Sequence, residues 1–158
     1  MSDDILELTP VQMDALREIG NVGAGNSATA LSQIINHRID MNVPQVSIVP
    51  LGDVPDLVGG PDVMVVGVFL RVYGSAPGNI LFLLPAESAF YLVDMLMGKK
   101  HGETKNLDFM DESALMEIGN ILAGAYLNAL FNLTKLSLLP SIPALAVDMA
   151  GAILSVVL

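Results

Sequence analysis

The sequence contains no cysteine and few basic residues. Without cysteine there is no disulfide framework, no thiolate nucleophile and no cysteine-ligated zinc or iron–sulfur site. Seven Lys plus Arg against seventeen Asp plus Glu give a formal net charge of −10. This is the wrong sign for neutralising nucleic-acid phosphates or anionic lipid, so we expect neither nucleic acid nor a membrane as partner.

Long charge-free and targeting segments are also missing. The stretch Ile118 to Thr134 carries no charge, but it contains three asparagines and is shorter than the roughly 20 residues that a bilayer span needs. We interpret it as a buried helix. The first seven residues carry three acidic residues and no Lys or Arg, unlike a secretory signal. Together with the absence of cysteine, this predicts a cytoplasmic protein.

The composition is that of one compact domain. Hydrophobic residues make up 53% of the 158 residues and charged residues 15%, which excludes intrinsic disorder. This length suits a single core better than two independent ones. We therefore predict one domain over residues 1–158.

An internal repeat is the feature on which the interpretation depends. The segment 14–25 recurs 99 residues later as 113–124, which predicts a duplicated architecture with repeats at about 9–98 and 108–158. The positions of the first copy that match their counterparts are Ala15, Leu16, Glu18, Ile19, Gly20, Asn21, Ala24, Gly25, Ala30, Leu31 and Pro44.

Each copy begins with the pattern of an amphipathic helix, because apolar residues recur at three- and four-residue steps. We expect Thr9 to cap the first helix and Asp111 the second. Segments rich in β-branched residues predict strands after the first helix. The predicted strands are 46–51, 63–72 and 79–84, followed by a helix over 87–97 and a junction over 99–106.

The second copy is shorter than the first. Residues 145–149 correspond to the first strand and 150–158 to the segment after it, but no counterpart of 63–84 follows. We expect an incomplete second repeat, whose sheet is either incomplete or borrows strands, because an unpaired edge recruits another chain.

The repeated helices carry polar residues on one face. Asp14, Glu18 and Asn21 are spaced i, i+4, i+7, which places them together over about two turns. The equivalents are Ser113, Glu117 and Asn120. A solvated stripe would explain one copy, and shared ancestry could preserve both without function. A merely solvated face, however, has no need to keep a carboxamide at one position.

A Glu and an Asn one turn apart suit phosphoryl chemistry. A carboxamide has donors and an acceptor, so it can orient water for in-line attack without acting as a base. A carboxylate can bind an ammonium of a partner's active site. No constellation of His, Cys or Arg lies near the motif, which argues against a covalent intermediate.

Two other features indicate ligand binding only weakly. His37 and His101 are far apart in the sequence, and we interpret them as solvated loop residues and expect no metal site. The glycines of 20–25 do not follow the dinucleotide or P-loop order. We interpret these small residues as permitting close helix packing.

Both copies share one spaced pattern, in which Asp or Ser is followed by Glu, Asn and, after 22 intervening residues, Pro. The residues are Asp14, Glu18, Asn21 and Pro44, then Ser113, Glu117, Asn120 and Pro143. The doubled pattern resembles the signature of the CheC, CheX and FliY chemotaxis phosphatases over almost the whole chain. Two complete motifs resemble CheC or FliY more than the one-site CheX, and CheC most.

The resemblance implies an α/β fold in which two long motif helices lie side by side on a mostly antiparallel sheet with pseudo-twofold symmetry. It also implies hydrolysis of the aspartyl phosphate of the response regulator CheY. By resemblance, Glu18 and Glu117 contact the regulator, and Asn21 and Asn120 position water. Mg²⁺ is expected in the regulator and no cofactor in this chain. Asp14 and Ser113 are weaker binding assignments, and Pro44 and Pro143 are expected to shape a turn.

A second partner is implied in the same way. Proteins similar to CheC bind CheD, a receptor-modifying deamidase, and Asp148 is a candidate contact because it is the only charge from Leu136 to Leu158. A helix N-cap or a strand-end carboxylate would explain Asp148 equally well. Two other function classes stay open: a non-catalytic flagellar-switch or CheD-binding module of the same fold, and a nucleotide- or metal-dependent enzyme.

Overall fold

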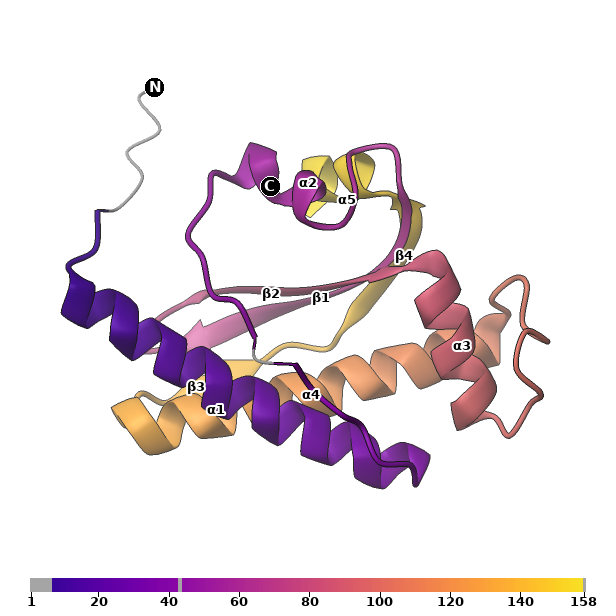
Figure 1. The fold of residues 1–158 in the computed structure, drawn as a ribbon, viewed down its shortest axis with the longest axis horizontal. Coiled ribbons are helices and arrows are strands. Elements are labelled where there is room, and N and C mark those ends of the chain that lie inside the picture. Colours follow the sequence, from indigo (N-terminus) through magenta and orange to yellow (C-terminus); the bar gives the residue numbers. More distant parts are fainter. Residues whose placement is uncertain (1–6, 43, 158) are drawn as a thin grey trace.

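Two long helices, one from each repeat, run side by side (Figure 1). The computed structural model describes residues 7–42 and 44–157. Helix α1 spans Pro10–Ile35 and helix α4 spans Phe109–Thr134, 26 residues each. Both stop at a residue in the left-handed conformation, Asn36 (φ 53°) and Lys135 (φ 60°), which ends a helix. The repeat in the sequence is therefore a structural repeat down to the helix ends.

The starts of both helices are capped in the same way. Thr9 accepts a hydrogen bond from the Gln12 amide and caps α1 as predicted. The prediction that Asp111 caps α4 is wrong, because the N-cap lies about one turn earlier, at Asp108. The Asp108 carboxylate accepts from the Asp111 amide at 2.8 Å, and the Asp111 carboxylate accepts from the Asp108 amide at 3.2 Å. Asp111 thus completes a capping box instead of opening the helix.

The sheet is built around its longest strand, and every pairing in it is antiparallel. Strand β1 pairs with β2 along one edge and with β3 and β4 in tandem along the other. The bounds are β1 Met64–Gly74, β2 Gly78–Pro85, β3 Leu138–Pro140 and β4 Ala144–Met149. The predicted strands 63–72 and 79–84 are confirmed, as is the α/β class with its mostly antiparallel sheet.

The predicted strand 46–51 is wrong. Residues 44–50 form no ladder, and a short 3₁₀ turn, Leu51–Asp53, begins where the strand should end. Their second-copy equivalents form β4, which pairs with β1. The described residues form a four-stranded sheet.

Helices cover both faces of the sheet (Figure 1). Helices α1 and α4 lie on one side, and the short helices α2, Val54–Leu57, and α5, Ala150–Val157, lie on the other. Alternate residues of β1 serve the two layers, because neighbouring strand residues point to opposite faces. Val66 packs in a cluster with Leu115 and Ile118 of α4, whereas Val65 packs with Ala150 and Ile153 of α5.

Helix α4 is also long and apolar enough to cross a membrane by length and composition alone. An 18-residue window of it has a mean hydropathy of 1.3, and 33% of that window is buried. The core helix of a globular protein meets the same criterion, and α4 packs against both α1 and β1.

A carboxylate network holds the junction between the repeats. Helix α3, Ala86–Leu96, ends next to a loop whose amides at Gly102 and Thr104 donate to the buried Asp94 carboxylate at 2.8 and 3.0 Å. The Lys99 ammonium lies 3.1 Å from the buried Asp111 carboxylate. These contacts attach the predicted junction 99–106 to the first turn of α4.

The network shifts the pKa of three groups. Hydrogen bonding from Thr104 lowers the pKa of Asp94, against the opposing effect of burial. Burial raises the pKa of Asp111, but the Asp108 amide and Lys99 lower it by more, so the net direction is downward. The hydrogen bond to Asp111 raises the pKa of Lys99.

Stability should fall in acid as these carboxylates protonate. Their folded-state pKa values lie below the unfolded value of about 3.9, so the contribution is complete above that pH and is lost as the pH falls through the folded values. The contribution of Lys99 is complete below about pH 10.4 and is lost as the pH rises above it. Urea unfolding of Asp111→Asn and the parent should show a stability difference that narrows below about pH 4. A difference that is the same at every pH would contradict this assignment.

Candidate functional site

The four predicted catalytic side chains are all exposed on the two long helices. Glu18 and Asn21 lie on α1, and Glu117 and Asn120 lie on α4. The buried Gly20 and Gly119 precede the two asparagines and face the interior. The structure therefore displays each Glu/Asn pair on a solvent-facing helix surface.

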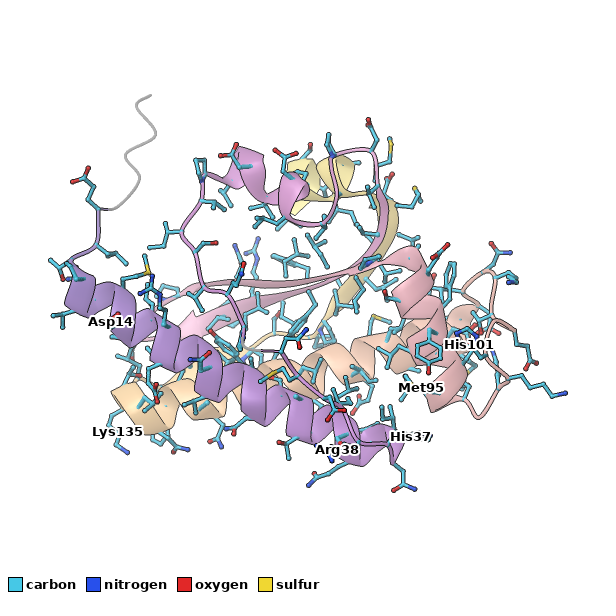
Figure 2. The ribbon with its side chains drawn as sticks, in the orientation of Figure 1. Asp14, His37, Arg38, Met95, His101 and Lys135 are labelled. Atoms are coloured by element: carbon cyan, nitrogen blue, oxygen red, sulfur yellow. The ribbon has the colours of Figure 1, made fainter. Side chains whose placement is uncertain are left out.

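The helices run in opposite directions, so the two pairs lie at opposite ends (Figure 2). Asp14, near the start of α1, lies at the same end of the helix pair as Lys135, which follows α4, whereas His37, which follows α1, lies at the other end. Each Glu lies before the point where its helix crosses the other. Counting about 1.5 Å per residue along each helix up to that crossing, Glu18 and Glu117 are about 20 Å apart along the helix axes. The structure makes two separate sites, not one composite site.

The crossing of α1 and α4 repeats itself through equivalent residues. The Ser27 hydroxyl donates to the Leu122 carbonyl at 3.1 Å. At Gly23, the equivalent of Leu122, a Cβ atom would lie 2.5 Å from the ring of Tyr126, the equivalent of Ser27. The two contacts are related by a local pseudo-twofold axis, which places the two motifs in equivalent positions.

A glycine beside each Asn sits directly on a valine. A Cβ atom on Gly20 would lie 2.5 Å from Cγ2 of Val46, and one on Gly119 would lie 2.5 Å from Cγ1 of Val68. Close packing thus accounts for both motif glycines, against an extended segment and a strand; of the glycines in 20–25, Gly23 is the one that meets the other helix, as the sequence predicts. Because each glycine faces inward, the asparagine that follows it, about 100° further round the helix, is turned away from that contact.

The two sites differ in charge. At the first site the Arg17 guanidinium lies 3.2 Å from the Asp14 carboxylate, and both side chains are exposed. The second site has Met116 and the half-buried Ser113 in these positions. Arg17 is absent from the sequence-based site, although its i, i+3 spacing from Asp14 is a recognisable signal. Pairing with Arg17 relieves the repulsion between Asp14 and Glu18.

Comparison with known proteins follows this duplication. The model of the CheC-like family matches residues 11–48 and 110–146, one segment in each repeat. The chain is 46% identical over 146 residues to the CheY-P phosphatase CheC of Bacillus subtilis (strain 168), covering 91% of this chain and 70% of that protein. The chain belongs to the CheC-like family. The resemblance read from the doubled motif is confirmed.

A further relative in sequence and a solved structure agree with this family. The chain is 29% identical over 122 residues to the flagellar motor switch phosphatase FliY of Bacillus subtilis (strain 168), covering 77% of this chain and 32% of that protein. The crystal structure of Thermotoga maritima FliY superposes with a TM-score of 0.78 at 27% identity, covering 92% of this chain and 72% of that chain. The pseudo-twofold arrangement of motif helices on a sheet is thus a CheC-like fold.

Asp148 lies apart from both motifs of this CheC-like chain. It is exposed near the end of β4, where its carboxylate accepts a hydrogen bond from the Met149 amide at 2.7 Å. With Arg71 and Val147 it lines an apolar groove of about 320 Å³ between the sheet and α5. The sequence left a helix N-cap and a strand-end carboxylate open as structural explanations of Asp148, and this hydrogen bond matches the strand-end carboxylate.

The motif prolines have different local settings. Pro143 immediately precedes β4, as expected of a residue that shapes the turn into a strand. Pro44 is half-buried at the start of the extended segment 44–50, which forms no strand. Neither lies on the helices that carry the Glu/Asn pairs.

The packing beneath Asn120 can be tested with a glycine pair from one helix. Gly119→Ala should destabilise the fold by about 1–3 kcal/mol, because a stiff, buried Val68 must move. Gly124→Ala is the matched control, since a Cβ atom there meets nothing within 4 Å, and it should stabilise α4 by about 0.5–1 kcal/mol. Thermal unfolding of both variants measures the difference. Equal stability of the two variants would show that the contact between Gly119 and Val68 does not limit how closely α4 approaches β1.

Proposed function

We propose that this chain hydrolyses the aspartyl phosphate of the chemotaxis response regulator CheY. The observation that carries the proposal is the pair of exposed Glu/Asn sites at equivalent positions of α1 and α4. The name of the 46% identical relative, CheY-P phosphatase CheC, supports the substrate. A site on an exposed helix face suits a protein substrate whose own active site it enters.

The amide of each Asn would position the attacking water. The water oxygen attacks phosphorus in line, the bond from phosphorus to the aspartyl oxygen breaks, and inorganic phosphate leaves carrying both water protons, while the aspartate regains its free carboxylate. A carboxamide can accept from the water and donate to the phosphoryl group at once. Because such reactions depend on positioning and charge stabilisation, Asn21 and Asn120 need not act as bases.

The carboxylates would serve association. Glu18 and Glu117 each lie one helical turn from an Asn, and neither fits a role next to a negatively charged phosphoryl group. A charge-assisted bond to an ammonium in the regulator's active site would place the adjacent Asn over the phosphoryl group. Magnesium in the regulator supplies neutralisation of the phosphoryl charge, and this chain would bind no cofactor.

The runner-up is a non-catalytic module of the same fold, serving the flagellar switch or CheD. Intact Glu/Asn pairs at both ends of the helix crossing favour catalysis, because a structural part needs neither water-positioning amide. Decay of phosphorylated CheY with and without this protein separates the two. In either function the expected location is the cytoplasm, where the regulator acts.

Replacing both asparagines should slow catalysis strongly while binding survives. Asn21→Ala with Asn120→Ala is expected to slow dephosphorylation on the order of a hundredfold or more, because transition-state stabilisation of a few kcal/mol is lost. Each single variant should keep part of the activity, since the sites are separate. Phosphate release measures turnover, and a separate titration measures affinity.

Two variants sharpen that experiment. Glu18→Ala with Glu117→Ala should weaken association with the phosphorylated regulator, since an anchoring charge-assisted contact is removed. Asn26→Ala with Asn128→Ala is the matched control, because both residues are exposed on the same helices outside the motifs. Full turnover by the Asn21, Asn120 double variant would overturn the mechanism.

We also propose that a CheD-type partner docks at the groove beside Asp148. This apolar groove lies on the opposite face of the sheet from the motif helices and is flanked by Asp148 and Arg71. Asp148→Lys should weaken the complex about tenfold or more through charge reversal and leave dephosphorylation unchanged. Glu7→Lys, which makes the same charge change at an exposed residue before α1, is the control in a titration with CheD. Equal affinity of both variants would reject the assignment.

A further inference from the structure

The first turn of α4 exposes two large apolar side chains. Phe109 is 79% exposed and Met110 is 60% exposed, and Phe109 is the most exposed aromatic residue in the part of the chain that the structure describes. Side chains of this size gain free energy when a partner removes them from water.

Phe109 and Met110 lie on the same face of α4 as the polar residues of the second site. At 3.6 residues per turn, Phe109, Ser113 and Asn120 fall within about 40° of one another around the helix, and Met110 falls within about 20° of Glu117. Phe109 lies only about 12 Å from Glu117 along the axis. A protein large enough to enclose Glu117 and Asn120 therefore also reaches the first turn.

The backbone under the two side chains is held in place. Asp108 and Asp111 exchange capping-box hydrogen bonds on either side of them. The Lys99 ammonium, 3.1 Å from Asp111, attaches this turn to the junction between repeats. Such a turn presents Phe109 and Met110 without a backbone ordering cost on binding, which favours them as anchor residues.

The first site has neither an aromatic side chain nor a methionine at the two equivalent positions. The equivalents of Phe109 and Met110 are Pro10 and Val11, of which Val11 is 78% exposed. The capping box beneath them is formed by the exposed Thr9 and Gln12 without an ion pair to a neighbouring loop. The first site also carries Arg17 where the second carries Met116. The first turn of α1 thus exposes smaller apolar side chains than the first turn of α4, with Pro10 in place of Phe109 and Val11 in place of Met110.

We propose that Phe109 and Met110 form a docking contact that belongs to the second site only. This contact binds an apolar surface beside the phosphorylated aspartate of the regulator. The proposal rests on the phosphatase function proposed above and adds an anchor to it. The two sites then differ in affinity for one substrate while sharing one Glu/Asn chemistry.

The test isolates each site before removing the anchor. In the Asn21→Ala background only the second site turns over, and adding Phe109→Ser with Met110→Ser should raise KM about tenfold or more with kcat changed less than about twofold. In the Asn120→Ala background the same two substitutions should leave KM and kcat unchanged. Phe109→Leu, which keeps an apolar side chain, should retain most of the affinity.

The outcomes separate the anchor from the chemistry. An unchanged KM in the Asn21→Ala background, or the same loss in both backgrounds, would overturn the docking contact while the phosphatase function stands. If the unsubstituted protein releases no phosphate, the proposed function fails. Titration with the regulator carrying beryllofluoride, a stable mimic of aspartyl phosphate, then decides the anchor. Equal affinity of the parent and the Phe109→Ser, Met110→Ser variant in that titration would overturn it as well.

Discussion

The close crossing of α1 and α4 is the contact on which the arrangement of the sites depends. Gly23 leaves room for the ring of Tyr126, and the Ser27 hydroxyl bonds to the Leu122 carbonyl at 3.1 Å. These are equivalent positions of the two repeats, so each contact has a counterpart across a pseudo-twofold axis. A larger residue at Gly23 would separate the helices and change the direction in which both motif faces point.

The crossing also explains why the duplication produces two sites. Antiparallel helices related by this axis carry their N-terminal halves to opposite ends of the pair (Figure 2). Each Glu/Asn pair precedes the crossing on its own helix, so each ends on a separate surface. A regulator bound at one end therefore leaves the other end uncovered, unless it extends along the whole helix pair.

The shared backbone nevertheless supports unequal surroundings. Asp14 and Arg17 form an exposed ion pair beside Glu18, whereas Glu117 follows a turn that exposes Phe109 and Met110. Exposed ion pairs contribute little to affinity, while apolar anchors in a covered contact contribute more. The same chemistry can therefore operate at both ends with different strengths of association.

By itself the sequence determined the two long motif helices and α3, the strands 63–72 and 79–84, the face that carries Glu18 and Asn21, and the family. These features depend on hydrogen bonds and periodicity within a few residues, which is why a repeat of 99 residues reproduces even the helix ends. Tertiary structure alone decided that 44–50 forms no strand, because a strand needs a distant partner for its backbone groups. It alone also decided the distance between the two sites and the exposure of Phe109, because these depend on which surfaces pack and which face water.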